Sequence, residues 1–376
     1  MDTNTQILSG RDAVNESTDT GAAGFVRPPR DPKLNGRILE AVHIWERGLS
    51  GSLRGRADLA EALTTSDFPI LLGSVFDREL MAQYEDISPV WQAFARRSIV
   101  KDFRPKKLVD LLGGKAILDA VAEGAPYPAR AASEAEYSLT VGKRGARIAL
   151  TWEMLINDDL DAFRDLPSRL ATGARDTEDY LATSLLVIAG GANTAFFKAG
   201  NSNAPTALPL TSVNLAAALL AVSTRKDADG RPIINKGTVL MVPPALELTA
   251  LAILNATEIR TTEGSKLLIG GNELRGKVSV VVNPWLPVIA VDAKTDARWF
   301  ILPAPSAARP ALALGFLRGH EVPDLRVKAD TGQRVGGGSI TAEEGSFEFD
   351  DIQYRVRHVL GGATLDPIAT YVSNGS

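Results

Sequence analysis

Cysteine is absent from the 376 residues, which excludes disulfides, thiolate catalysis and cysteine metal sites. Histidine is scarce, and a histidine-rich zinc site would need His43, His320 and His358 from three distant segments. The sequence also lacks a Gly-x-Ser-x-Gly elbow and a His-Glu-x-x-His motif, which are typical of hydrolases. We therefore expect no enzymatic activity, no metal and no cofactor.

Long apolar runs are missing as well. The most apolar window, residues 278–291, is interrupted by Asn283, Pro284 and Pro287, so we expect no membrane span. The first 30 residues are polar and contain no apolar stretch of the signal-peptide type, so we expect no secretory signal. The chain has 41 basic and 45 acidic side chains, a net charge of −4, and this balance argues against a protein whose main task is to bind nucleic acid phosphates.

The chain is long enough for two or three domains, and its first part differs in composition from the rest. Residues 1–33 are rich in Asp, Asn, Thr, Gly and Pro, a composition that does not bury enough apolar surface to order itself alone. We interpret residues 1–65 as an N-terminal arm.

Residues 115–152 have the pattern of an extended β-ribbon. Tyr137, Leu139 and Val141 alternate with polar residues. Ile148, Leu150 and Trp152 likewise alternate with smaller or polar residues, namely Arg147, Ala149 and Thr151. The stretch between these runs, residues 142–145, contains two glycines and predicts a bulge or bend. One face of the ribbon is polar and small, so we expect it to project from the body of the protein.

Residues 166–189 predict the longest helix of the chain, ending at Gly190 and Gly191. A compact α+β unit is predicted after it. Its expected helices cover residues 213–223 and 244–254, and its expected strands cover residues 238–242, 278–282, 288–292 and 298–302. A strand over residues 352–358, with its arginines on one face, and a final stretch near residues 368–372 complete the chain.

The distribution of charge is the remaining unusual feature. Five acids lie within the nine residues 343–351, whereas residues 96–107 and the ribbon are basic. Each run can be a solvated surface, but opposite runs on separate extended elements also suit pairing between subunits. The candidate contact residues are Arg96, Arg97, Lys106, Lys107, Lys143, Arg144, Arg147, Glu343, Glu344, Asp350 and Asp351.

Several local strings, in their order along residues 66–376, resemble the major capsid proteins of tailed bacteriophages with the Hong Kong 97-type fold. They are Glu-Gly-Ala-Pro-Tyr-Pro from residue 123, Leu-Thr-Val-Gly-Lys from 139, Ile-Ala-Leu-Thr-Trp from 148, Asn-Asp-Asp from 157, Thr-Val-Leu-Met-Val-Pro-Pro from 238, Leu-Arg-Gly-Lys-Val from 274 and Ala-x-x-x-Pro-x-Ala from 363.

The resemblance implies an α+β fold with an N-terminal arm, an extended hairpin loop, a peripheral domain and an axial domain. The arm corresponds to residues 1–65, and the peripheral domain to residues 66–210 and 341–376, with the hairpin loop at residues 115–152 and the spine helix at residues 166–189. The axial domain corresponds to residues 211–340.

The same resemblance implies a structural function. The chain would assemble in the host bacterial cytoplasm, as pentamers and hexamers, into an icosahedral virion shell that encloses double-stranded DNA without binding it specifically. Scaffold, portal and cement proteins are the implied partners. Some relatives join subunits by a lysine–asparagine isopeptide bond. Lys143 matches the string around that lysine, but the partner position falls at or near Asp350, so we expect a charge contact and no covalent crosslink.

Two alternatives stay open. An encapsulin-like bacterial compartment has the same fold and encloses an enzyme, although the long arm and ribbon favour the phage capsid. A soluble hydrolase or transferase with an unrecognised site is an alternative of another class. It would need titratable groups that converge in a pocket, and the sequence offers no candidate set.

Overall fold

The computed structural model describes the parts of the chain that carry most of the expected elements. The described residues are 77, 79–110, 135–151, 166–226, 230, 232–233, 237–263, 266–328, 332–333, 339–340 and 351–375. The predicted N-terminal arm, most of the acidic segment and much of the predicted hairpin loop lie outside these ranges.

The chain divides into two compact units. The first unit comprises residues 1–86, 144–172 and 322–358, and the second comprises residues 87–143, 173–321 and 359–376. Helix α7 (Leu166–Ser184), strand β4 (Gly142–Thr151) and strand β16 (Asp351–Thr364) each contribute residues to both units.

A four-stranded sheet forms the centre of the second unit. Its order is β10 (Ser279–Val282), β7 (Thr238–Val242), β11 (Trp299–Pro303) and β17 (Tyr371–Ser373). Strands β10 and β7 are parallel, whereas β11 runs antiparallel to both β7 and β17. All five residues of β11 are buried, which explains its continuous apolar sequence.

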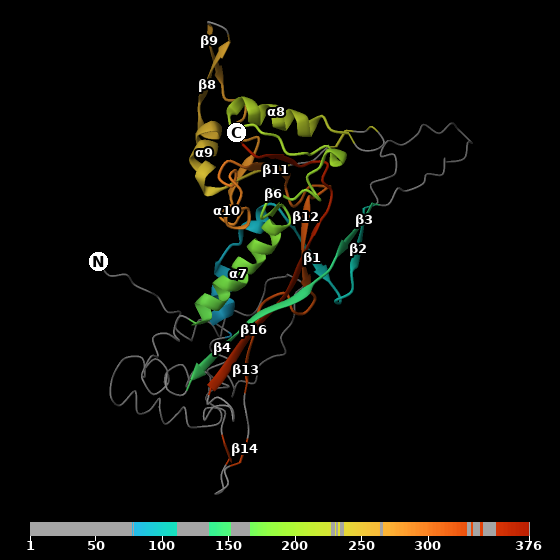
Figure 1. Cartoon of the computed structure of the whole chain (residues 1–376), viewed down its shortest axis with the longest axis vertical. Helices are drawn as coiled ribbons and strands as arrows, with labels where there is room; N and C mark the ends of the chain where they lie inside the picture. The colour runs from blue at the N-terminus through green and yellow to red at the C-terminus, as the bar shows by residue number, and fades with distance from the viewer. Residues whose placement is uncertain are drawn as a thin grey trace, which may run out of the picture. The chain divides into compact units, whose positions relative to one another are not determined.

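Two hydrophobic clusters cover the two faces of this sheet. Leu240 and Ile301 pack with Leu215 of α8 (Ser212–Ser223) and Ala250 of α9 (Glu247–Asn255), and Figure 1 shows both helices near β11. The neighbouring strand residues, such as Met241, belong to the other cluster. That cluster contains residues of α7 and of the 3-10 helix η1 (Val90–Ala93). The alternation of side chains along each strand therefore separates the two cores.

A second sheet of the same unit joins β1 (Arg96–Val100), β12 (Leu312–Leu317) and the C-terminal part of β16. Strand β1 is parallel to β12, and β12 is antiparallel to β16. Gly315 lies opposite Gly361 in this register. A Cβ atom at Gly361 would lie 1.8 Å from the carbonyl oxygen of Thr140, so glycine is required for this close approach.

Short antiparallel ribbons complete the second unit. They are β2 (Lys106–Asp110) with β3 (Ala135–Leu139), β5 (Val187–Ile188) with β6 (Gly191–Ala192), and β8 (Glu258–Glu263) with β9 (Lys266–Gly271). The β8–β9 ribbon extends beyond α9 (Figure 1) and was not predicted from the sequence.

The first unit is built on the N-terminal part of β16. This strand pairs antiparallel with β13 (Asp324–Lys328) and also pairs with β4. Tyr354, Val356 and His358 are buried on one face of β16, and the Tyr84 ring contacts the His358 ring edge-on at 6.0 Å between centroids. A small ribbon, β14 (Gly332–Gln333) with β15 (Ser339–Ile340), lies in the same unit.

Many of the predicted elements are confirmed. Helix α8 begins after Thr211, whose side chain accepts a hydrogen bond from the Asn214 backbone N–H as an N-cap. The helix predicted after Pro244 consists of the 3-10 helix η3 (Pro244–Leu246) followed by α9. The strands predicted near residues 238–242, 278–282, 298–302 and 352–358 are present as β7, β10, β11 and β16.

Three local predictions differ from the structure, in whole or in part. The helix predicted over residues 166–189 ends at Ser184, because Val187 and Ile188 pair with Gly191 and Ala192 as strand β5. The stretch predicted as a bulge or bend, residues 142–145, contains no bend, since all four residues belong to strand β4. Residues 286–289 form a helical turn, α10 (Leu286–Ile289), with proline at its start, where a strand was predicted over residues 288–292.

Candidate functional site

The cationic residues predicted as contact sites fall into two groups, and the first group contacts the chain itself. Arg96 of β1 is partly buried, and its Nε donates to the carbonyl oxygen of Pro305 at 3.1 Å. The Nζ of Lys106 donates to the carbonyl oxygen of Ile99 at 2.7 Å. These two side chains therefore hold the second unit together locally.

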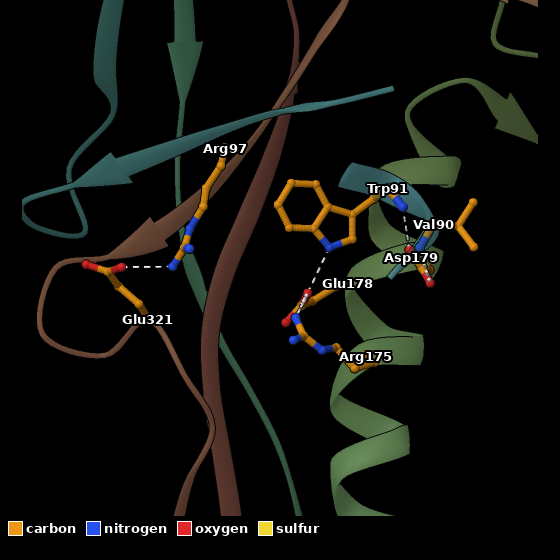
Figure 2. Close-up of polar contacts among 7 residues, drawn as sticks. All are labelled: Val90, Trp91, Arg97, Arg175, Glu178, Asp179 and Glu321. Atoms are coloured by element: carbon orange, nitrogen blue, oxygen red, sulfur yellow. Dashed lines mark hydrogen bonds and ion pairs between the residues drawn. The ribbon is translucent and has the colours of Figure 1, made fainter. Parts of the chain in front are cut away.

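Arg97 also has partners within the second unit. Its Nη2 lies 2.9 Å from Glu321 Oε2, as Figure 2 shows. The guanidinium carbon lies 5.1 Å from the centroid of the Phe316 ring, a cation–π distance. Because the Arg97 side chain is about half exposed, this ion pair contributes little to stability.

The second group of predicted cations is exposed. Lys143 lies with its Nζ 5.6 Å from the centroid of Phe103, an aromatic residue in the turn between β1 and β2 that is itself about half exposed. Lys107 and Arg144 are exposed on β2 and β4. Arg147 is exposed too, and its Nη1 donates to Oε1 of Gln353 at 3.3 Å.

Glu343, Glu344 and Asp350 lie outside the described residues. Asp351 begins β16, although only its backbone is described.

The first unit brings together four charged residues, on strands β13 and β16, that are not among the predicted contact residues. Arg326 of β13 lies directly opposite Arg355 of β16, and Asp324 lies opposite Arg357. Asp324 Oδ2 accepts from Arg326 Nε at 2.8 Å and from Arg357 Nη2 at 2.9 Å. The sequence predicted that the arginines of β16 lie on one face, but it did not predict the neighbouring strand β13.

A buried polar cluster fixes η1 to helix α7 within the second unit (Figure 2). Asp179 Oδ1 accepts from the Trp91 backbone N–H at 2.7 Å, and its Oδ2 accepts from the Val90 N–H at 3.2 Å. Glu178 Oε2 accepts from the indole Nε1 of Trp91 at 2.8 Å and from Arg175 Nη1 at 3.2 Å. Burial raises the pKa of the Asp179 carboxyl, and the N–H groups of Trp91 and Val90 oppose this shift. The cluster is a packing device with both carboxylates hydrogen-bonded.

No group of three or more His, Cys, Asp or Glu side chains that could hold a metal ion occurs among the described residues. Within the same ranges, no helix is long and apolar enough to cross a membrane.

Comparison with known proteins decides the family. A model of the phage capsid protein family matches residues 135–373, which is more than half of the chain. The chain belongs to this family. The capsid resemblance predicted from sequence motifs is thereby confirmed at the family level. As a major capsid protein, the chain is a structural subunit that forms the viral shell, and it is not an enzyme.

Solved structures resemble the capsid protein at low sequence identity. The capsid of a native GTA particle computed with C5 symmetry is 13% identical, with a TM-score of 0.45, over 76% of this chain and 90% of that chain. A structure from Gordonia phage Cozz is 13% identical, with a TM-score of 0.43, over 75% and 84% of the two chains. One from Mycobacterium phage Che8 is 16% identical, with a TM-score of 0.41, over 74% and 90%. No curated protein sequence matches the chain.

Proposed function

We propose that this capsid protein has the Hong Kong 97-type fold and assembles, as pentamers and hexamers, into an icosahedral shell that encloses double-stranded DNA. The match of the phage capsid family to residues 135–373 carries the proposal. In this assignment residues 1–65 are the N-terminal arm, residues 66–210 and 341–376 the peripheral domain, and residues 211–340 the axial domain. The hairpin loop lies within residues 115–152, and α7 supplies the spine helix of the peripheral domain.

Exposed aliphatic side chains of the second unit support assembly with other copies. Val213 and Leu220 of α8, Leu248 of α9, and Val288 and Val291 are between 58% and 79% exposed in the single subunit. Removing apolar surface from water contributes about 25 cal/mol per Å². Contacts between neighbouring subunits would cover these side chains, and their burial would stabilise the shell.

Charge contacts between copies are the second part of the proposal. The exposed cations Lys107, Lys143, Arg144 and Arg147 face solvent in the single subunit. They would pair with acids of a neighbour, drawn from Glu343, Glu344, Asp350 and Asp351. Exposed pairs contribute only about 0.2–1 kcal/mol each, so they would set the register between subunits more than the affinity. Arg96 and Lys106 contribute less, because they are partly buried and donate to carbonyl oxygens, and Arg97 contributes less because it already pairs with the carboxylate of Glu321.

The net charge of −4 agrees with a capsid shell that surrounds DNA without binding it specifically, because tight binding to phosphates needs many cationic contacts. We further propose that assembly takes place in the cytoplasm of the bacterial host and that scaffold, portal and cement proteins are the partners. The finished shell is the capsid of the virion.

The proposal is tested by imaging and by the contents of the particles. The expressed protein should sediment as closed shells, and negative-stain images should show five-fold and six-fold clusters of subunits. A chain that stays monomeric at high protein concentration would contradict shell formation. Particles made in the phage host should contain double-stranded DNA that nuclease cannot reach. A protected protein cargo in place of DNA would show an encapsulin-like compartment instead.

A further inference from the structure

The first unit presents a sheet face with an excess of positive charge, which we call the arginine face. It consists of Arg147 on β4, Arg326 on β13, and Arg355 and Arg357 on β16. Arg355 and Arg357 alternate with Tyr354, Val356 and His358, which are buried on the opposite face of β16. Arg147, Arg326 and Arg355 are exposed, and Arg357 is partly buried.

Strands β13 and β16 place positive charges side by side, and among the described side chains of this face a single carboxylate compensates them. Arg326 is the direct cross-strand neighbour of Arg355. Asp324 is shared, since its Oδ2 accepts from both Arg326 and Arg357 at 2.8 and 2.9 Å. Arg147 donates to the neutral amide of Gln353. The face therefore carries four guanidinium groups and one carboxylate, which is a net charge of +3 among these five side chains. Two of the four guanidinium groups contact the carboxylate.

Such a face is suited to an acidic partner. Like charges directly opposite one another in an antiparallel pair are destabilising unless an anion compensates them. The guanidinium group is planar and weakly hydrated, and it matches the two oxygens of a carboxylate. An anionic segment laid across β13 and β16 would relieve the repulsion and gain charge-assisted hydrogen bonds.

The sequence contains a segment of complementary charge. Residues 343–351 contain five acids and two phenylalanines and no basic residue. We propose that the arginine face binds this acidic segment from a second copy of the chain. The inference rests on the proposed shell and deepens it, because it names the cationic surface of one contact between subunits and adds Arg326, Arg355 and Arg357 to the predicted contact residues.

The extended conformation of β16 favours binding of the acidic segment from a second copy over binding of the segment from the same chain. Asp351 begins the strand, and four residues of extended chain separate it from Arg355, about 13 Å at 3.3 Å per residue. The other acids precede Asp351 and are therefore further from Arg355 along the sequence. A neighbouring subunit can bring its own segment to the face without such a constraint.

Charge reversal in separate chains tests the proposal. One variant carries Arg326→Glu and Arg355→Glu on the face, and a second carries Glu343→Lys and Glu344→Lys in the segment. A third combines all four changes. A control, Arg275→Glu with Lys277→Glu, reverses two exposed charges elsewhere. Circular dichroism and thermal unfolding confirm that each variant is folded, and sedimentation measures the yield of shells.

We expect the face variant and the segment variant each to lose at least tenfold in shell yield, while the control assembles like the wild type. An equimolar mixture of the two defective variants should recover assembly, since the reversed face of one subunit meets the reversed segment of the other. The four-substitution variant should recover it as well. Wild-type assembly should also weaken at high salt, as expected for exposed charges.

Each other outcome overturns the inference in a distinct way. Recovery in the four-substitution variant but not in the mixture means that the segment binds the face of its own chain. No recovery in either case means that another anion, such as nucleic acid phosphate, occupies the face. Normal assembly of the single-site variants means that the face is not a contact. If the wild-type chain forms no shells, the proposed function itself is refuted. This outcome is distinct from the three above, in which the wild type assembles.

Discussion

The hydrogen bond between Trp91 and Glu178 allows one interaction in the core to be tested quantitatively. The indole Nε1 donates to Glu178 Oε2 at 2.8 Å, and both side chains are buried (Figure 2). Trp91→Phe removes this donor and keeps an aromatic ring in place. A buried hydrogen bond to a charged acceptor contributes about 1.5–3 kcal/mol, and the smaller ring leaves a cavity that costs about 1 kcal/mol. We expect the variant to lose about 3 kcal/mol of unfolding free energy.

Guanidinium unfolding of unassembled subunits, followed by circular dichroism, measures this loss without depending on tryptophan fluorescence. Trp285→Phe is the matched control, because Trp285 is only partly buried and contacts the edge of Tyr180, with 5.7 Å between ring centroids. We expect the control to lose less than about 1 kcal/mol. A loss for Trp91→Phe within about 1 kcal/mol of the control would refute the assigned contribution of the indole hydrogen bond.

A double-mutant cycle with Glu178→Leu, which removes the acceptor oxygens, isolates the pair. If the indole and the carboxylate interact as described, the two substitutions should be coupled by about 1.5 kcal/mol. Additive losses would mean that the effect of Trp91→Phe comes from packing alone.

Asp179→Asn removes a carboxyl whose pKa is raised by burial above its ordinary value of 3.8. The folded state therefore binds a proton more readily than the unfolded state, so the wild type should gain stability relative to this variant as the pH falls through the folded pKa. Unfolding at about pH 7 and about pH 4 measures the difference, and a constant difference would contradict the assignment. Gly361→Ala would place a Cβ atom 1.8 Å from the Thr140 carbonyl oxygen, whereas Gly142→Ala meets nothing within 4 Å. Chemical denaturation should show a loss above about 3 kcal/mol for the first and below about 0.5 kcal/mol for the second, and equal losses would be inconsistent with the close approach. Assembled shells boiled in detergent should run as single subunits, because the position matched to the crosslink partner of Lys143 carries an acid instead of an amide; a ladder of multiples would show a covalent bond.

Local sequence signals predicted many of the elements. The apolar runs of β7 and β11 indicated strands because these strands are buried in a central sheet. Thr211 marked the start of α8 through its capping side chain. The motifs between residues 123 and 369 were sufficient to indicate the capsid family, which the match over residues 135–373 confirms.

Only the tertiary structure decided which groups the charged side chains contact. The sequence shows a basic run at residues 96–107, yet Arg96 binds a carbonyl oxygen 209 residues away, at Pro305. Strand register likewise brings Arg326 beside Arg355, from two segments whose charges appear unrelated along the chain. In both cases the contact joins residues that are far apart in the sequence. Composition and periodicity depend only on residues within one segment, so they do not predict such a contact.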